Sequence, residues 1–389
     1  MKISILANTS WYVYNFRKNL IQTLQENGHE VSVIAPFDDY VDRLTEMGVK
    51  HYGLSLSRRS MNPFREVVSC VGLFRLLRTI GPDIILTFTV KCNLYTGICR
   101  RFLRFEQIAN VSGLGEVFEK NGLINHLVSH LYKFALAGSK RVFFQNNEDM
   151  QMIVRRHLLP ENLCRRIPGS GVDLEAFHPL SSLSNNKPRI FFMFGRLVPK
   201  KGYDLFMKAA ENIYLEGNYN AEFWIMGIVD DSRKESKELL ERIMALQRKG
   251  IIRYLPPSDD VAIVLQQVDV VVLPSEYNEG VPRSILEAMA CGKPIITTDW
   301  KGCKDTVEHG KNGYLIKVGD RADLSRYILQ FLETRSEKLH QMGIESRKKA
   351  EEEFDDRKVL KAYLSDIEES FSGNRHAIAA TSHGSSIAP

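Results

Sequence analysis

Residues 270–298 read VVVLPSEYNEGVPRSILEAMACGKPIITT and predict a complete strand–loop–helix–strand unit. The apolar run 270–273 predicts a buried strand, and residues 294–298 predict the next one. Gly280 and Pro282 stand just before the predicted helix, whose first N–H groups have no partner inside the helix. Such a loop, leading into a helix N-terminus, is a suitable site for a phosphate or for sugar hydroxyls.

Two carboxylates, Glu279 and Glu287, flank this turn. Ionised carboxylates accept hydrogen bonds and donate none, so this pair suits a ligand with many hydroxyl groups. A second interpretation is that Arg283 and Glu287 form an ordinary surface pair one helical turn apart, with Glu279 a solvated loop acid. From these residues alone both interpretations stay open.

The same alternation of short apolar runs and helical stretches extends over the whole chain. Repeated strand–helix alternation predicts a parallel sheet that is covered on both faces. A polar stretch at 179–188 interrupts the pattern like a linker, and the alternation then restarts. The predicted strands are 3–7, 31–35, 84–88, 107–111 and 142–145 before the linker, and 189–194, 221–226, 268–273 and 294–298 after it.

This restart predicts an α/β protein of two Rossmann-like, doubly wound domains that face a deep cleft. At 389 residues the chain also exceeds the size at which one hydrophobic core usually stops growing. We expect an N-terminal domain at 1–178, the linker at 179–188 and a second domain at 189–355. A disordered tail is expected at 372–389.

A second polar loop follows the predicted strand 189–194. Gly195 lets a diphosphate approach the backbone closely, Arg196 can donate to two phosphate oxygens, and Lys201 adds a positive charge. Both cations would stabilise the charge that develops on a diphosphate leaving group. A surface turn with two solvated cations is the alternative interpretation.

Composition excludes several function classes. The six cysteines form no Cys-x-x-Cys, which favours a reducing compartment over a structural zinc site. No Asp-x-Asp occurs, so a carboxylate-held metal is not expected, and no Walker loop or dinucleotide fingerprint is present. His126 and His130 have metal-ligand spacing but lack an evident third ligand, so a polar helix face is the preferred interpretation.

The distribution of charged and apolar residues bears on where in the cell the protein is located. Residues 1–180 hold 22 Lys and Arg against 16 Asp and Glu, and basic clusters adjoin apolar stretches there. This mixture suits either docking on an anionic membrane surface or core helices with solvated basic faces. With no signal peptide or membrane-spanning run expected, we predict a cytoplasmic protein, and no binding of nucleic acid is expected.

These motifs together resemble the family 4 glycosyltransferases, retaining enzymes of the two-domain GT-B architecture. The resemblance rests on Gly195-Arg-Leu with Lys201-Gly, on the segment from Glu279 to Glu287, on Gly292-Lys-Pro, and on Gly169-Ser-Gly-Val-Asp173. It implies that residues 356–371 form a terminal helix that packs back on the first domain. It implies that Glu279, Arg196 and Lys201 are catalytic. It also implies that the donor is held by Gly195, Gly280, Val281, Pro282, Ser284 and Glu287.

The first domain resembles one subgroup, the bacterial transferases that extend polyprenyl-diphosphate-linked sugars, such as those that add N-acetylgalactosamine to diphosphate-linked bacillosamine. The segments that carry this resemblance are 14–17, 57–64 and 111–118. It implies a lipid-linked saccharide acceptor, and therefore a cytoplasmic protein that associates peripherally with the inner face of the cell membrane. The predicted acceptor-binding residues are Asn15, Arg17, Lys91, Gly113 and Gly115. The sequence departs from the family in lacking a Gly-Gly in the first loop and a cleft histidine, which leaves Glu116 as a weak candidate for activating the acceptor.

The predicted function is therefore metal-independent, retaining transfer of a hexose or N-acetylhexosamine from a UDP-sugar to a polyprenyl-diphosphate-linked saccharide in bacterial glycan biosynthesis. The UDP-sugar is a substrate, and no cofactor is expected. Two alternatives remain at this stage: a UDP-sugar 2-epimerase on the same fold, and a non-catalytic subunit that binds nucleotide sugars.

Overall fold

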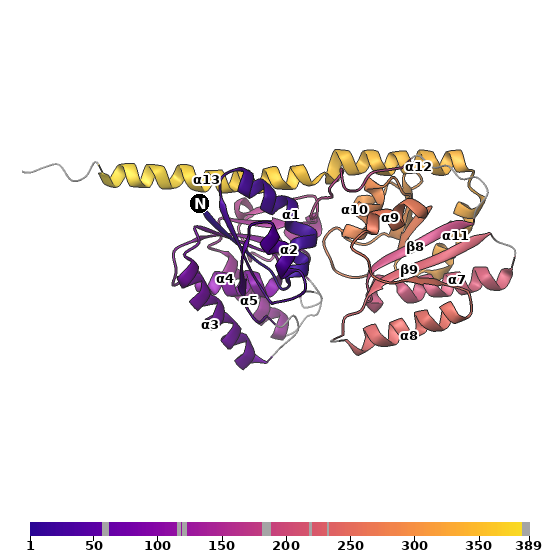
Figure 1. Ribbon diagram of the computed structural model, residues 1–389, viewed down its shortest axis with the longest axis horizontal. Helices are drawn as coiled ribbons and strands as arrows, with labels where there is room; N and C mark the ends of the chain where they lie inside the picture. The colour runs from indigo at the N-terminus through magenta and orange to yellow at the C-terminus, as the bar shows by residue number, and fades with distance from the viewer. Residues whose placement is uncertain are drawn as a thin grey trace, which may run out of the picture. The chain divides into compact units, whose positions relative to one another are not determined.

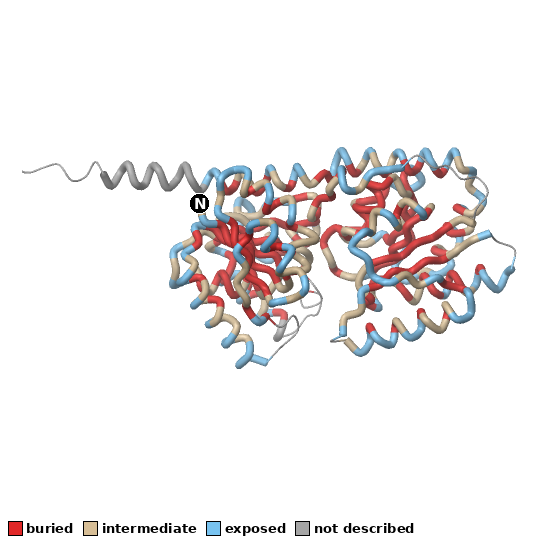
Figure 2. The backbone as a smooth tube through the Cα atoms, viewed as in Figure 1, coloured by how far each residue is buried: buried red, intermediate tan, exposed pale blue. Residues whose placement is uncertain are grey.

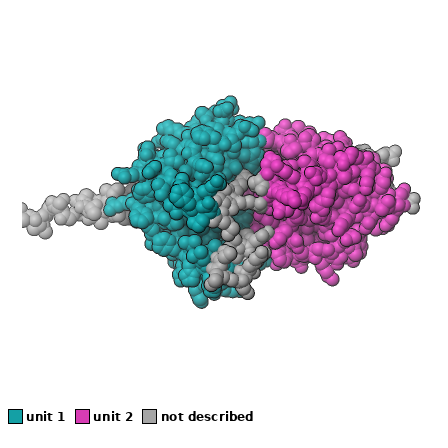
Figure 3. Space-filling model, turned by 90° about the horizontal axis from the view of Figure 1, so that it is seen from below, with its two compact units in different colours: residues 1–167, 357–389 teal, residues 168–356 magenta. Residues whose placement is uncertain are grey.

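A computed structural model describes residues 1–56, 62–114, 118, 123–180, 188–217, 220–231 and 233–382. The chain forms two compact units, coloured teal and magenta in Figure 3. Unit 1 comprises Met1–Ile167 and Arg357–Pro389, and unit 2 comprises Pro168–Asp356. Unit 1 is therefore built from two separate stretches of the chain.

Unit 1 is a parallel sheet with the described strands in the order β3-β2-β1-β4-β5-β6-β7. The strands are β1 (Lys2–Leu6), β2 (Glu30–Ala35), β3 (Lys50–Gly53), β4 (Ile84–Thr87), β5 (Glu106–Val111), β6 (Arg141–Phe144) and β7 (Cys164–Arg166). The helices are α1 (Ser10–Glu26), α2 (Val41–Glu46), α3 (Pro63–Ile80), α4 (Val90–Cys99), α5 (Leu123–Leu136), α6 (Asn147–Arg155), the short η2 (Glu161–Leu163) and α13 (Asp356–Ser382), whose first residue belongs to unit 2. In register, Ile3 of β1 lies opposite Val31 of β2 and Ile84 of β4.

Unit 2 repeats the arrangement, with its described strands in the order β10-β9-β8-β11-β12-β13, all parallel. They are β8 (Arg189–Arg196), β9 (Ala221–Ile228), β10 (Arg253–Leu255), β11 (Val270–Leu273), β12 (Ile295–Thr298) and β13 (Gly313–Ile316). The helices are η3 (Pro199–Lys201), α7 (Tyr203–Glu216), α8 (Lys234–Arg248), α9 (Val261–Gln267), α10 (Arg283–Ala290), η4 (Lys304–Thr306), α11 (Arg321–Glu333), α12 (Ser336–Lys349) and the π-helical turn η5 (Ala350–Phe354).

The two sheets confirm the predicted doubly wound α/β fold. Their central strands are buried on both faces, as the red segments inside each unit show in Figure 2, and Figure 1 shows helices covering the sheets. The edge strands β3, β7 and β10 are partly exposed. In each sheet the direction of chain winding reverses once, between β1 and β4 and between β8 and β11. Open parallel sheets bind ligands beside the carboxyl ends of the strands at such a reversal. The expected cleft between the domains stays a prediction.

Local signals set the ends of the helices. The first helix begins at Ser10, because the Thr9 side chain accepts a hydrogen bond from the Tyr12 N–H and caps the helix. Helix α3 begins at Pro63 after the capping residue Asn62, and it ends at Gly81, whose backbone is left-handed.

The boundary between the units falls at Ile167, ahead of the predicted end of the first domain at 178. Backbone hydrogen bonds explain the difference: the Val172 N–H donates to Phe354 O (2.9 Å), and the Asp356 N–H donates to Val172 O (3.2 Å). In addition, the Arg347 guanidinium donates to the carbonyl oxygen of Phe177 (2.7 Å). Residues before the predicted linker are thus held by unit 2, and linker residues 181–187 lie outside the described residues.

The final helix belongs to unit 1. Val359, Ala362, Tyr363 and Ile367 of α13 are buried in the same apolar cluster as the central strands β1 and β2. The helix continues to Ser382, past residue 371 where the sequence prediction ended it. Alanine is the best helix former, and the alanines at 377, 379 and 380 favour this continuation.

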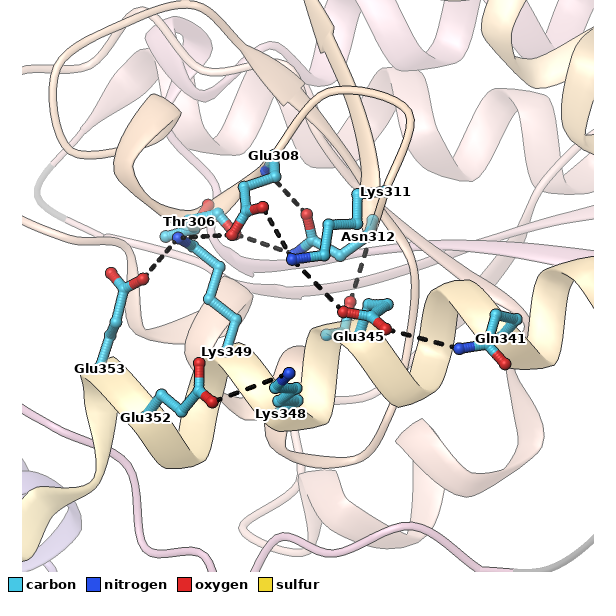
Figure 4. A network of polar contacts seen from close by, with 11 residues as sticks. Thr306, Glu308, Lys311, Asn312, Gln341, Glu345, Lys348, Lys349, Glu352 and Glu353 are labelled. Carbon is cyan, nitrogen blue, oxygen red and sulfur yellow. Dashed lines mark hydrogen bonds and ion pairs between the residues drawn. The ribbon is translucent and has the colours of Figure 1, made fainter.

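Helix α12 holds the loop that precedes β13 in unit 2 (Figure 4). Lys349 and Lys311 both contact the carboxylate of Glu308, at 3.5 and 3.0 Å, and Lys311 also reaches Glu345 at 3.5 Å. Lys311 and Glu308 are 51% and 48% exposed, so the pairs that they form contribute little stability. The buried contact beneath them, from Ser346 Oγ to Asn312 O at 3.2 Å, ties the loop to the helix more firmly.

Candidate functional site

The polar segments singled out in the sequence meet at the chain reversal of unit 2. Strands β8 and β11 are neighbours, with Val271 opposite Phe192, so the loops that follow them leave the same edge of the sheet. Gly195 and Arg196 end β8, and residues 274–282 connect β11 to α10. These two loops are distant in the sequence but lie at one edge of the sheet, the edge at which open parallel sheets bind ligands.

An ion pair joins the two loops. Lys201 Nζ lies 3.1 Å from Oε1 and 3.2 Å from Oε2 of Glu279, and it donates its hydrogen bond to Oε2. The Lys201 side chain is 8% exposed and that of Glu279 is 17% exposed, so water screens this pair only weakly. The buried Oε1 accepts no hydrogen bond from the described residues, and it can still accept one from a ligand.

Glycines let the loops approach one another. A Cβ on Gly202 would lie 2.1 Å from the carbonyl oxygen of Pro274, and one on Gly302 would lie 1.9 Å from that of Gly280. Both glycines have left-handed backbones, with φ of 88° and 77°. Only glycine satisfies both requirements, so the backbone contacts that shape the loop from 274 to 280 are built into the sequence.

Side-chain hydroxyls fix the same loops. Thr297 Oγ1 donates to Leu273 O (2.7 Å), and Thr298 Oγ1 donates to Ser275 O. From the other side, Tyr203 Oη donates to Gly195 O at 3.0 Å. Because all six residues are buried or partly buried, these bonds hold the loop backbone in one conformation.

Glu287 lies inside the unit and not on its surface. Arg283 Nε donates to Glu287 Oε1 at 2.7 Å, so the predicted pair along the helix exists, but only 11% of the Glu287 side chain is exposed. Burial raises the pKa of the Glu287 carboxyl above its ordinary value, and the neighbouring Arg283 offsets this effect only in part. The solvated surface pair considered for these residues is therefore excluded.

The start of α10 brings further polar atoms to the site. Gly280, Val281 and Pro282 are buried, and Pro282 precedes the helix without a side-chain cap. Ser284 Oγ is buried and makes no hydrogen bond within the described residues, and the same holds for Asn278 Oδ1. Sequence reasoning missed Asn278, because an asparagine in a polar loop carries no signal of burial.

Arg196 stands beside this loop. Its guanidinium carbon is 5.8 Å from the ring centroid of Tyr277. Burial raises the pKa of the Tyr203 hydroxyl, and the positive charge of Arg196 offsets this effect in part. Arg196, Lys201 and Glu279 thus occupy the same edge of unit 2. Among the predicted donor-side residues, the structure brings all of them to the two loops after β8 and β11 or to the first turns of α10.

The predicted acceptor residues of unit 1 fall in different settings. Arg17 is 2% exposed, its guanidinium carbon lies 4.2 Å from the Phe88 ring centroid, and it donates to Tyr12 Oη at 2.8 Å. Arg17 therefore has a packing role that the sequence prediction did not include. Asn15 Nδ2 donates to its own helix, at Trp11 O (3.0 Å).

Two other residues lie at the carboxyl edge of the unit 1 sheet. Lys91, in the first turn of α4 after β4, contacts Glu66 at 2.8 Å. Gly113 follows β5 with φ of 124°, a backbone that favours glycine. Gly115 and Glu116 lie outside the described residues.

Other candidates for chemistry have structural roles. His130 Nδ1 bonds to His126 O one turn earlier, and no group of three or more His, Cys, Asp or Glu in the described ranges is placed to hold a metal ion. Burial raises the pKa values of the Cys92, Cys291 and Cys303 thiols to about 12. These thiols stay protonated at neutral pH and serve as small apolar side chains.

Comparison with protein families gives a match in each unit. The family model for group 1 glycosyl transferases matches residues 176–349, and the model for glycosyl transferase 4-like proteins matches residues 2–146. The chain is a glycosyltransferase with the two-domain GT-B fold. This glycosyltransferase carries Gly195–Lys201 and Glu279–Glu287 within the group 1 match.

Curated relatives of the glycosyltransferase include two bacterial enzymes. It is 29% identical over 350 residues to the N,N'-diacetylbacillosaminyl-diphospho-undecaprenol alpha-1,3-N-acetylgalactosaminyltransferase of Campylobacter jejuni, covering 86% of this chain and 90% of the relative. It is 27% identical over 297 residues to the UDP-Gal:alpha-D-GlcNAc-diphosphoundecaprenol alpha-1,3-galactosyltransferase of Escherichia coli, covering 73% and 74%. These names do not favour the epimerase or the binding subunit considered earlier.

Solved structures share the fold of the glycosyltransferase. A sucrose-phosphate synthase from Thermosynechococcus elongatus aligns with a TM-score of 0.79 and 18% identity, covering 96% of this chain and all of that one. The Anabaena protein HepE, solved with UDP and glucose, aligns with a TM-score of 0.77 and 18% identity, covering 95% and 99%. In the described part of the glycosyltransferase, no helix is both long enough and apolar enough to cross a bilayer.

Proposed function

We propose that this glycosyltransferase transfers a hexose or N-acetylhexosamine, with retention of configuration and without a metal ion, from a UDP-sugar to a polyprenyl-diphosphate-linked saccharide. The substrate classes are supported by the two relatives, whose names specify diphosphoundecaprenol-linked acceptors and, in one case, a UDP-sugar donor. The single observation that carries the proposed site is the Lys201–Glu279 ion pair at the chain reversal of unit 2.

The leaving diphosphate would be stabilised by fixed cations. Arg196 and Lys201 emerge from β8 and η3 at the edge where parallel sheets bind phosphates. In a site with little water, cations that are already in place stabilise developing negative charge without reorganising. Lys201 is held by Glu279 before any ligand arrives, so its position is prepared in advance.

The sugar and the nucleotide would be held by carboxylates and backbone donors. Glu279 Oε1 is buried and accepts no hydrogen bond from the described residues, which suits a hydroxyl of the transferred sugar. Glu287 would accept hydrogen bonds from ribose hydroxyls while Arg283 keeps its Oε1 in place. The first N–H groups of α10, together with Gly195, Val281, Pro282 and Ser284, would surround the donor.

The acceptor side of the proposal rests on unit 1. Lys91 and Gly113 leave the carboxyl edge of its sheet next to the reversal between β1 and β4, where a second ligand site is expected. Asn15 and Gly115 complete the proposed set, and Arg17 is left out because it is buried against Phe88.

The experiment is product analysis by mass spectrometry with purified enzyme, candidate UDP-sugars and a diphosphate-linked acceptor. Arg196→Ala and Glu279→Ala are each expected to lower kcat by about 100-fold or more, the usual effect of removing one preorganised electrostatic group. Lys208→Ala, which removes an exposed cation from α7, is the matched control and should keep full activity.

Three outcomes would contradict the proposal. Unchanged turnover in both variants would remove the site assignment. A product formed from the UDP-sugar alone would point to epimerisation. Loss of activity on chelation of metal, restored by adding a divalent ion, would contradict the metal-independent mechanism.

A further inference from the structure

Helix α3 exposes an apolar stripe on the outside of unit 1. Phe64 is 76% exposed, Val67 60%, Val68 57% and Val71 44%. Their spacing of three and four residues places them on one side of the helix. Isolated exposed apolar residues are ordinary, but an aligned group marks a surface that binds something.

A second stripe lies on α5. Leu127, Leu131 and Phe134 are 62%, 38% and 51% exposed, again one helical turn apart. Helix α4 contacts both α3 and α5, and the three helices lie on the same side of the sheet in Figure 1. This common side follows from right-handed crossovers that all proceed in one direction, from β3 to β6.

The loop after α4 connects the two stripes. The exposed ring of Phe102 lies 6.4 Å from that of Phe74 in α3. The adjacent Arg101 donates to Phe134 O in α5 at 2.7 Å, and its guanidinium carbon lies 4.5 Å from the Phe134 ring centroid. We call this continuous surface the α3–α5 face.

The charges on the α3–α5 face are almost all positive. Its exposed cations are Arg65, Arg75, Arg78, Arg101, Arg104 and Lys133. The segment 62–80 contains one acid, Glu66, and this acid is bound by Lys91 and by Tyr95 Oη. The segment 123–140 contains no acid at all.

We propose that the α3–α5 face docks on a bilayer containing anionic lipids, with the apolar stripes entering the headgroup region and the cations meeting lipid phosphates. Exposed apolar side chains beside Arg and Lys are the composition that binds such surfaces. A second copy of the chain would bring the same positive charges face to face, which opposes self-association through this face. Nucleic acid would use the cations but not the aliphatic stripes.

The α3–α5 face lies near the edge of the unit 1 sheet that is proposed to bind the acceptor. Lys91, at the start of α4, binds Glu66 in the first turn of α3, so the apolar beginning of α3 adjoins the carboxyl edge of the unit 1 sheet. A bilayer bound there would lie beside the edge proposed for the acceptor. Docking depends only on the exposed apolar side chains and the positive charge of the α3–α5 face, whichever sugar the enzyme transfers.

Sedimentation of the full-length enzyme with phosphatidylcholine vesicles, with and without phosphatidylglycerol, tests the proposal. We expect binding only to the anionic vesicles and its loss at high salt. Val67→Asp and Leu127→Asp should each weaken binding about tenfold, because an apolar contact is lost and a repelled charge is added. Arg75→Ala should weaken binding about fivefold.

Leu215→Asp is the matched control, since Leu215 is 79% exposed on α7 of unit 2, and it should leave vesicle binding unchanged. Activity on a short, water-soluble acceptor should persist in all four variants, which separates docking from catalysis. Absence of vesicle binding would overturn the proposal, as would equal binding by parent and face variants. It would also be overturned if light scattering showed that the parent self-associates and that Val67→Asp abolishes the association without affecting vesicle binding.

Discussion

At the scale of single residues, the site depends on pairs that are remote in the sequence. Lys201 and Glu279 are separated by 78 positions, yet their charged groups are in contact. Each residue was identifiable as a candidate from its motif, but the contact between them results from the adjacency of β8 and β11. The burial of Glu287 also depends on tertiary structure, and it distinguishes this residue from an ordinary surface acid.

Gly302 provides a test of the loop packing. We expect Gly302→Ala to destabilise unit 2 by about 3 kcal/mol, because its Cβ would meet the Gly280 carbonyl oxygen at 1.9 Å. Gly310→Ala is the control, with a similar φ of 80° and no atom within 4 Å, and it should cost about 1 kcal/mol. Urea unfolding measures both. Equal losses would show that the close approach is unimportant.

The raised pKa of Glu287 predicts that the difference in stability between the parent protein and the Glu287→Gln variant depends on pH. Its pKa is raised in the folded state, so the folded protein binds the proton more tightly and loses stability as pH rises above the ordinary carboxyl pKa. Glu287→Gln removes this loss. Its Tm should therefore match that of the parent in acid and equal or exceed it at neutral pH, while binding of UDP weakens.

Thermal unfolding at several pH values and calorimetric titration with UDP would measure the two effects. Glu238→Gln, in an exposed pair with Lys234 on α8, is the control and should change neither. A Glu287→Gln variant that is less stable than the parent at neutral pH would contradict the expected sign.

At the scale of secondary-structure elements, nearby residues set where a helix begins and ends. Distant residues set which other elements the helix packs against. Thr9, Asn62 and Gly81 mark the ends of α1 and α3 through capping that can be recognised in the sequence. The partners of α13 are another matter. Tyr363 packs at 4.7 Å from Phe143, and its hydroxyl accepts a hydrogen bond from Asn110 Nδ2 at 2.9 Å, across 253 positions.

Replacing Tyr363 tests the role of α13. Tyr363→Ala should destabilise unit 1 by about 4 kcal/mol through the lost ring, and Tyr363→Phe by about 1 kcal/mol through the lost hydrogen bond. Lys361→Ala, on the exposed side of the helix, should be neutral. Denaturant unfolding gives the comparison. If Tyr363→Ala behaved like Lys361→Ala, α13 would not be part of the core.

At the scale of the whole molecule, the chain leaves unit 1 at Ile167 and returns to it at Arg357. Unit 2 is continuous and contains its own apolar core. Unit 1 requires Val359, Tyr363 and Ile367 from the returning helix to complete its core. Unit 1 therefore needs two separate stretches of the chain to complete its core, whereas unit 2 needs only one.

Fragments should reveal this asymmetry. We expect residues 168–356 to fold alone with a cooperative transition, and residues 1–167 alone to remain poorly folded, because their core lacks α13. Adding residues 357–382 as a separate peptide should restore structure in the first fragment. Circular dichroism with thermal melting checks each case. A cooperative melt of 1–167 by itself would contradict the expectation.

The sequence by itself determined the two doubly wound sheets, because alternating apolar runs and helical stretches are properties of neighbouring residues. It also singled out the residues after β8 and β11, because parallel strands carry their loops at one edge. Only the tertiary structure decided that Arg17 packs against Phe88, that Glu287 is buried, and that Asn278 is buried in the loop after β11. It likewise placed residues 168–178 with unit 2. Burial and pairing are sums over contacts from distant parts of the chain, and no local pattern contains them.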